Sequence, residues 1–313
     1  MNIINKVFSH QSLIDKPPIL IDLGASGEIH KKWKVIAKHS ICVAFDADTR
    51  DFKPIITEGD GWKKLYSLNR LVLAKEDKMS DFYLTKSPHC SSALQPDNEA
   101  LKPWIFSYLF KVERSIQLPS LSLSTSLSEI GIDYIDWYKT DTQGTDLRIF
   151  DSLPDEIKNK VIVAEFEPGI IDAYQGEDKL NELMLYMDKK PFWVTNMLIK
   201  GSQRIEQSDY ESLNYFQKRW ISLFLRTAPG WCEISYLNKM ANDNTMRLRD
   251  YLLAWVFATI EGEHGFALSI SKRGYHYFSD DLFLILERES RKRLSYGYHK
   301  IVFSALKRIF RKN

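Results

Sequence analysis

The chain has 313 residues, 44% of them hydrophobic, and its 43 lysines and arginines nearly balance 41 aspartates and glutamates. This composition is ordinary for a soluble globular protein, and nothing in the charge calls for a nucleic-acid partner. Cys42, Cys90 and Cys232 lie far apart and form no C-x-x-C pair, which argues against a disulfide framework or zinc site and favours a reducing cytoplasm. Residues 1–16 lack the apolar region of a signal peptide, and no segment predicts a membrane span.

The first predicted strand covers residues 19–23, an apolar run that follows two prolines. Its composition is typical of a strand buried on both faces of a parallel sheet. Gly24 and Gly27 permit a sharp turn and a close approach to a ligand because neither has a Cβ, and a helical stretch is expected at residues 29–38. A strand, a glycine turn and a helix are the elements with which α/β proteins bind nucleotides. The alternative is a glycine turn without a ligand.

Asp46 ends the next apolar run, residues 41–45. An acid at the end of the second strand, about 20 residues beyond the glycines, is where such folds hydrogen-bond a ribose diol. The order Asp22-x-Gly24-x-x-Gly27 lacks the third glycine of a dinucleotide fingerprint and includes an acid in the strand. A carboxylate near the turn suits the sulfonium cation of S-adenosylmethionine and is unfavourable beside the phosphates of a nicotinamide dinucleotide.

The region after Asp46 is predicted to contain a polar stretch as far as residue 69, then the third core strand at residues 71–74 and another strand at 81–85. Residues 86–97 contain two prolines and small polar side chains, which predicts a loop lying over another part of the protein. His89 in this loop is either a base or an exposed loop histidine.

A later strand, residues 134–139, runs into a polar turn that contains Asp141. Residues 145–153 have helical spacing of apolar side chains. Asp141 is therefore expected at a carboxyl end of the sheet, on the same edge as Gly24 and Asp46.

Residues 161–168 form the next predicted strand, and its period of two puts Glu165 and Glu167 on one face. These two acids are either an exposed rim or the lining of a catalytic site. No H-x-x-H or clustered spacing indicates a metal, although Asp141 with both glutamates could bind one if the strand ends converge.

Five segments together resemble one enzyme family: Ile-Asp-Leu-Gly-Ala-Ser-Gly at 21–27, Ala-Phe-Asp-Ala-Asp at 44–48, Ser-Ser at 91–92, Lys-Thr-Asp-Thr-Gln-Gly-Thr-Asp-Leu at 139–147 and Ala-Glu-Phe-Glu-Pro at 164–168. The combination resembles the FkbM family of S-adenosylmethionine-dependent methyltransferases, over roughly residues 19–206. The most specific segment is 139–147, which looks like the family's K-[IT]-D-x-[EQ]-G-x-[DE]-L signature.

The resemblance implies an α/β class I methyltransferase fold, Rossmann-like, with a seven-stranded mixed sheet, and methyl transfer to a hydroxyl of a sugar, polysaccharide or glycolipid. It assigns Asp141 to the acid that faces the methyl donor and acceptor, and Asp46 to the ribose-binding acid. The cofactor turn corresponds to Asp22, Gly24, Ala25 and Gly27. Gln143 replaces the glutamate of many relatives, which puts a base or metal role for this position in doubt.

A sugar hydroxyl must lose its proton as it attacks, so a general base within hydrogen-bond distance is expected. Asp141 is the first candidate and Glu165 the second. In the alternative role, Asp141 only orients the methionine amino group of the cofactor. The rival function is a non-catalytic glycan-binding or scaffold protein on a methyltransferase fold.

We expect a cofactor-binding domain at residues 1–205 and a helical extension at 206–313. Residues 210–225 predict an amphipathic helix that packs on the sheet domain, and residues 249–260 predict a buried helix. His264 is expected in a loop between helices.

The end of the chain, residues 287–313, has nine lysines and arginines and two acids, with apolar residues at helical spacing between them. A basic amphipathic helix can lie on an anionic membrane surface, which would suit a lipid-linked acceptor. The alternative is a terminal helix docked on its own domain.

Overall fold

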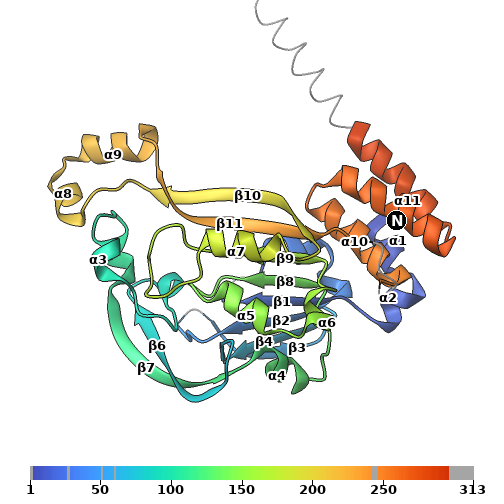
Figure 1. Cartoon of the computed structure of the whole chain (residues 1–313), viewed down its shortest axis with the longest axis horizontal. Helices are drawn as coiled ribbons and strands as arrows, with labels where there is room; N and C mark the ends of the chain where they lie inside the picture. The colour runs from blue at the N-terminus through green and yellow to red at the C-terminus, as the bar shows by residue number, and fades with distance from the viewer. Residues whose placement is uncertain (1–2, 27–28, 51, 60, 242–245, 296–313) are drawn as a thin grey trace, which may run out of the picture. The chain divides into compact units, whose positions relative to one another are not determined.

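The computed structural model describes residues 3–26, 29–50, 52–59, 61–241 and 246–295 (Figure 1). The chain divides into two compact units: the sheet unit, Pro18–Lys239, and the helical unit, which comprises the described residues of Met1–Pro17 and Met240–Asn313. The expected boundary after residue 205 falls inside the sheet unit. The reason is that the chain returns to the sheet as a strand at Ala228–Asn238, where the sequence analysis expected a helical extension.

The sheet unit contains a mixed sheet of eight strands: β1 (Ile19–Leu23), β2 (Ile41–Asp46), β3 (Ile55–Thr57), β4 (Lys64–Asn69), β8 (Trp137–Thr140), β9 (Val163–Phe166), β10 (Phe192–Ser202) and β11 (Ala228–Asn238). Their order is β10-β11-β9-β8-β1-β2-β4-β3. The strands β9, β8, β1, β2 and β4 are parallel to one another, whereas β3 and β11 run antiparallel to their neighbours. An α/β fold with a large mixed sheet is thus present, with eight strands in place of the expected seven.

The central strands of this sheet are buried on both faces. Every residue of β1 and β9 is buried, because helices or irregular segments cover both sides of the sheet. On one face, a continuous apolar core joins the strands to α4 (Leu123–Ser128), α5 (Asp146–Ser152) and α7 (Leu180–Met187). The strand expected at residues 19–23 and the helix expected at 145–153 are confirmed.

The opposite face is covered in part by Trp33, which meets Trp137 edge to face at 6.0 Å between ring centroids. Trp33 belongs to a 3-10 helix, η1 (Lys31–Val35), and a second one, η2 (Ala37–His39), follows. The helical stretch expected at residues 29–38 therefore exists as two short 3-10 turns.

A smaller sheet has the order β5-β7-β6 and is formed by β5 (Leu71–Val72), β6 (Asp77–Thr85) and β7 (Val112–Leu121). The third core strand predicted at residues 71–74 is therefore wrong. In the main sheet, the strand that pairs with β2 on the side away from β1 is β4. Its residues alternate between half-buried and buried, and the sequence pattern therefore predicted a polar stretch there. Short elements complete this region: η3 (Pro88–Cys90), α3 (Asn98–Leu101) and η4 (Ser107–Phe110).

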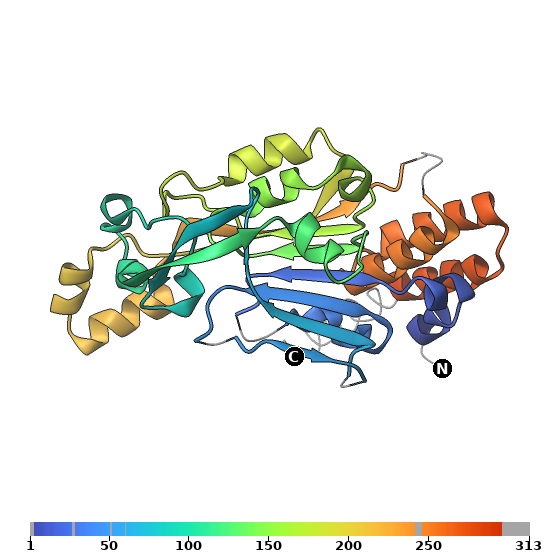
Figure 2. The same ribbon diagram turned by 90° about the horizontal axis from the view of Figure 1, so that it is seen from below.

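The longest strands, β10 and β11, form an antiparallel ribbon that carries two helices between them, α8 (Gln207–Ser212) and α9 (Tyr215–Phe224) (Figures 1 and 2). Since Ser202 pairs with Ala228, the segment that contains α8 and α9 begins and ends at neighbouring points of the ribbon.

Helix α6 (Asp155–Lys158) precedes β9.

The helical unit consists of α1 (Ile3–Phe8), α2 (Gln11–Asp15), α10 (Leu248–Ile260), α11 (His264–Phe278) and a helical stretch at 282–295. Helix α10 is buried almost all round, which confirms the prediction for residues 249–260, and its Trp255 donates to Ser290. His264 begins α11, so the loop expected there is wrong.

Most of the predicted basic tail lies outside the described residues. Among the helices that the structure does describe, none has the length and apolar character needed to cross a bilayer.

Candidate functional site

The strand order of the sheet creates a switch point between β1 and β8. From β1 the chain proceeds outward to β2 and β4, and it later returns to β8 on the other side of β1. In open α/β sheets, ligands bind outside the carboxyl ends of the strands at such a point. Gly24, Asp46 and Asp141 lie at the carboxyl ends of β1, β2 and β8.

Gly24 brings the turn after β1 against the end of β8. Its φ is +76°, and a Cβ at this position would lie 1.9 Å from the carbonyl oxygen of Asp141. The Gly24 amide donates to the Phe45 carbonyl at 2.9 Å, which ties the turn to β2 as well. Only glycine combines this φ with this close approach.

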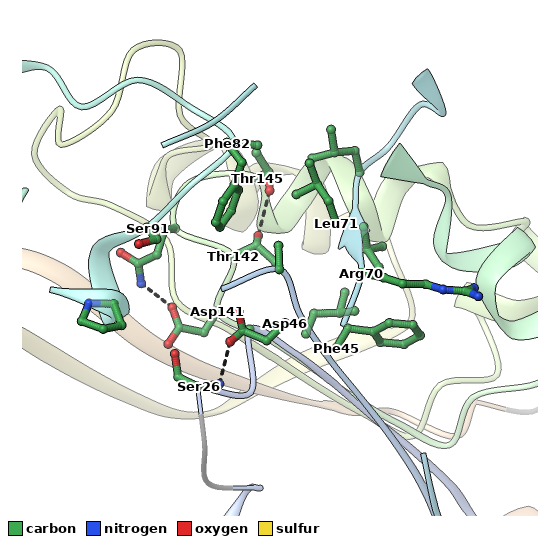
Figure 3. A pocket seen from close by; sticks show the side chains of 18 of the residues that line it. Ser26, Phe45, Asp46, Arg70, Leu71, Phe82, Ser91, Asp141, Thr142 and Thr145 are labelled. Atoms are coloured by element: carbon green, nitrogen blue, oxygen red, sulfur yellow. Dashed lines mark hydrogen bonds between the residues drawn. The ribbon is translucent and has the colours of Figure 1, made fainter. Parts of the chain in front are cut away.

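One hollow brings Gly24, Asp46 and Asp141 together (Figure 3). It encloses about 60 Å³. Its apolar lining includes Phe45, Leu71, Val72 and Phe82. The first hollow, as we call it, therefore combines two carboxylates with an apolar wall at the switch point of the sheet.

Asp46 accepts hydrogen bonds from two backbone amides, that of Ser26 at 2.8 Å and that of Asp48 at 2.7 Å. Burial raises the pKa of Asp46, and the two amide donors oppose this effect. Ser26 has a φ of +33°, which is unfavourable for a residue with a side chain. The predicted site residue Gly27 lies outside the described residues.

Asp22 and Ala25, two other residues predicted to bind the cofactor, are buried and do not line the first hollow. Asp22 lies 2.7 Å from the Lys139 ammonium and accepts from the His30 amide at 3.2 Å. Burial would lower the pKa of Lys139, but Asp22 and Asp141 outweigh it and raise the pKa. Asp22 therefore acts as the buried counter-ion of Lys139, so any effect of Asp22 on a ligand is indirect.

A second cavity, of about 530 Å³, shares His89, Asp141 and Gln143 with the first hollow. Most of its lining is apolar, and its aromatic side chains are those of Phe106, Phe110, Tyr174 and Trp231. Phe106 meets Trp231 edge to face at 6.0 Å between centroids. We call this space the aromatic cavity.

Asp141 lies at the junction of the two spaces, where Gln143 contacts it directly. The Gln143 amide nitrogen donates to Asp141, and the Tyr174 hydroxyl lies 2.9 Å from the Gln143 amide oxygen. The Glu167 carboxyl is near enough for the charge of Asp141 to raise its pKa. Gln143 has a φ of +56°, the second unfavourable backbone conformation in the lining of the first hollow. The Gln143 amide therefore bridges Tyr174 to Asp141. A glutamate at this position would instead repel the Asp141 carboxylate.

The two carboxyl groups of this network titrate at very different pH. Removal from water raises the pKa of Asp141 to about 6, against the opposing charge of Lys139. Removal from water, reinforced by the charge of Asp141, raises the pKa of Glu167 to about 9. The two carboxyl groups are coupled, so the pair retains one proton at neutral pH, and the more strongly raised pKa favours Glu167 as its carrier.

Glu165, the second candidate base, lines neither space that Asp141 lines. It accepts from the Trp137 indole at 3.0 Å and lies 3.3 Å from His30 Nε2. Burial alone would raise the pKa of Glu165, but His30 and Lys32 lower it below its usual range. Glu165 and Glu167 both line a third hollow, although Glu167 lies just beyond the end of β9. Glu167 is the one that also reaches the aromatic cavity.

The loop at residues 86–97 is fastened over the site. Arg50 binds both Asp48 carboxylate oxygens and donates to the Thr85 carbonyl at 2.7 Å and to the Ser91 hydroxyl at 2.8 Å. His89 in this loop is exposed and lines both spaces. The loop thus lies over another part of the protein, as predicted.

Asp146, the second acid of the 139–147 segment, organises the turn after β8. It accepts from the Thr140 hydroxyl, from the amide and hydroxyl of Thr142, and from the Glu167 amide. This buried carboxylate therefore fixes the ends of β8 and β9 relative to each other.

Within the described residues, no group of three or more histidine, cysteine, aspartate or glutamate side chains is arranged to hold a metal ion. Comparison of the chain with known protein families, curated proteins and solved structures finds no match.

Proposed function

We propose that the sheet unit is an S-adenosylmethionine-dependent O-methyltransferase that acts on a hydroxyl of a sugar, polysaccharide or glycolipid. The observation that carries this proposal is the meeting of Gly24, Asp46 and Asp141 in one hollow at the switch point of the sheet. Without the short edge strand β3, the sheet has the seven strands of the class I methyltransferase fold that the sequence resembles, which supports the proposal.

In this proposal the first hollow receives the adenosyl group. Asp46 binds the ribose hydroxyls, and the apolar wall around Phe82 packs against adenine. Small-molecule pockets usually enclose about 300 Å³ or more, so the hollow of about 60 Å³ must widen. The Ser26 amide occupies one oxygen of Asp46 and is the contact that a ribose hydroxyl would replace or share.

The aromatic cavity receives the acceptor. Flat aromatic side chains such as Phe106 and Trp231 can pack against the apolar faces of a sugar ring. Because Asp141 lines both spaces, the acceptor hydroxyl and the methyl group would meet beside it. Holding the two groups in line supplies much of the rate of such a displacement.

Asp141 is the base in this mechanism and Glu167 is its positioning residue. The carboxylate of Asp141 would accept the proton of the acceptor hydroxyl; bound S-adenosylmethionine would supply the methyl group and, with its methyl–sulfur bond broken, leave as S-adenosylhomocysteine. Protonated Glu167, whose pKa the charge of Asp141 raises, would donate to Asp141 and fix its orientation. The negative charge of Asp141 also attracts the sulfonium of the methyl donor.

Calorimetric titration of the purified protein with S-adenosylmethionine and with NADH tests the cofactor assignment. We expect heat of binding with the first and none with the second. Incubation with methyl-labelled cofactor and an extract of surface polysaccharide then tests the reaction. Binding without methyl transfer to any glycan would favour the non-catalytic alternative, and no binding of S-adenosylmethionine would overturn the proposal.

A further inference from the structure

Helix α9 presents an apolar stripe to solvent. Phe216, Trp220 and Phe224 recur at every fourth position and Leu223 lies three residues after Trp220, so the four side chains share one side of the helix. These side chains are 80%, 59%, 59% and 65% exposed. The sequence analysis expected this face to pack on the sheet domain, and that prediction is wrong: Ile221 is the buried residue of α9.

The stripe belongs to a firmly built helix. Asn214 and Gln217 form a reciprocal capping box at its N-terminus. At its other end, the Gln203 amide donates to the carbonyl of Ile221 at 3.4 Å and to that of Leu225 at 3.2 Å. Ile221 faces the protein, and the side of α9 that carries the stripe remains exposed.

The charge on α9 and its flanks is positive, whereas the preceding helix α8 carries Asp209 and Glu211. Lys218, Arg219 and Arg226 lie between residues 213 and 227, and this segment contains no aspartate or glutamate. Arg219 is adjacent to the aromatic residues, with its guanidinium 3.4 Å from the Tyr215 hydroxyl. Tryptophan, tyrosine and phenylalanine bordered by cations are the side chains that enter the interface of an anionic bilayer.

A second copy of the chain fits this surface less well. Pairing two α9 helices through their stripes would bring their like charges together, which is unfavourable. The basic segment at the end of the chain is also a poor candidate to cover the stripe. Residues 296–313 include five lysines and arginines and no acid, so they would be repelled by the cations of α9.

The ribbon that carries α9 also forms part of the aromatic cavity. Ser202 at the end of β10, and Gly230 and Trp231 near the start of β11, line that cavity. The Gln203 carbonyl, next to Ser202, accepts from the Ile105 amide at 3.5 Å. Helix α9 and these three cavity-lining residues thus belong to one continuous segment, β10-α8-α9-β11, which Figure 1 shows.

From these observations, the geometry points to α9 as an interfacial helix that docks the protein on an anionic lipid bilayer. The aromatic and leucine side chains of the stripe enter the headgroup region, and the neighbouring cations bind the lipid phosphates. This inference does not depend on the cofactor, because vesicle binding is measured without any methyl donor.

Co-sedimentation of the full chain with vesicles tests the inference. Vesicles of equal parts phosphatidylglycerol and phosphatidylcholine are compared with vesicles of phosphatidylcholine alone. We expect pelleting with the first that weakens at high salt. The triple variant Phe216→Ser, Trp220→Ser and Phe224→Ser should reduce the partition coefficient more than about tenfold, since burying one such side chain contributes about that factor.

Two further variants separate the contributions. Lys218→Glu with Arg219→Glu should reduce binding to the anionic vesicles by about fivefold per charge removed, or more. The control is Leu185→Ser with Ile56→Ser, which changes two residues that are 67% and 62% exposed elsewhere on the sheet unit and should leave binding unchanged.

Three results would overturn the inference. The wild-type chain could fail to pellet with the anionic vesicles, or the triple variant could pellet as well as the wild type. In the third result, the wild type does not bind vesicles, and light scattering shows that it is a dimer whereas the triple variant is a monomer. That result would identify a second copy of the chain as the partner.

Discussion

At the scale of single residues, the pair of Asp141 and Glu167 determines the chemistry available where the two spaces meet. Neighbouring carboxyl groups removed from water do not both ionise, so one proton is retained between them. The retained proton on Glu167 leaves Asp141 as the carboxylate that can accept another. Glu165, which the sequence suggested as a base, is engaged by Trp137 and His30.

Asp141→Asn is expected to abolish turnover because an amide cannot accept the hydroxyl proton. Affinity for S-adenosylmethionine should fall much less than the rate. In the wild type, kcat/KM should rise with pH through about 6, as Asp141 loses its proton. Initial rates measure the loss of turnover and the pH profile, and calorimetry on the same preparations measures the affinity for S-adenosylmethionine. A variant that retains most of the wild-type rate would remove Asp141 from the role of base.

Glu167→Gln is expected to stabilise the fold at pH 8 more than at pH 5. The folded-state pKa of Glu167 lies near 9, above its ordinary value of 4.5. The folded protein therefore holds a proton that the unfolded chain releases, and wild-type stability declines as pH rises between those two values. Glutamine keeps a donor for Asp141 and does not titrate. Thermal melts of both proteins at each pH measure the difference, and an equal shift at the two pH values would contradict the assignment.

Asp46→Ala is expected to weaken binding of S-adenosylmethionine by about 1.5–3 kcal/mol, the usual contribution of a hydrogen bond to a charged group. Calorimetry measures this value. The matched control is Asp133→Ala, which removes an exposed carboxylate outside the hollow and should leave affinity unchanged. Equal affinities of Asp46→Ala and wild type would exclude Asp46 from the cofactor site.

At the scale of elements, the site depends on the close meeting of the turn after β1 with the end of β8. The sequence predicted β1, β2, β8 and β9 because strands buried on both faces are continuous apolar runs. It did not predict β7 or β10, in each of which all residues but one are exposed or half-buried, so that they lack that signal. Periodicity also predicted α9 as a helix, but it cannot tell whether protein or solvent lies against the apolar face.

Gly24→Ala is expected to destabilise the sheet unit by about 2–4 kcal/mol, because the new Cβ meets the Asp141 carbonyl and the positive φ becomes strained. Gly131→Ala is the control: its φ is also positive, at +72°, but nothing lies within 4 Å of the added Cβ. It should cost only about 1–2 kcal/mol. Denaturant unfolding of both variants compares them, and equal losses would show that the close approach at Gly24 contributes nothing.

At the scale of the whole molecule, strand order assembles the site from segments that are distant in sequence. The positions of Gly24, Asp46 and Asp141 on one edge could be predicted, because parallel strands align their carboxyl ends. The bridge from Tyr174 through Gln143 could not, since it depends on how the segment after β9 folds back over the turn after β8. The division into two units was also hidden, because residues 1–17 group with the far end of the chain.

The pairing of Ser202 with Ala228 has a consequence for how this protein can change. Residues 203–227 leave β10 and enter β11 at two paired positions, so the length of this segment does not constrain the sheet. A tight hairpin could replace α8 and α9 there, or a longer insertion could be grafted in, with the strand register preserved. The segment is thus an interchangeable module, free to diversify while the scaffold beneath it stays the same.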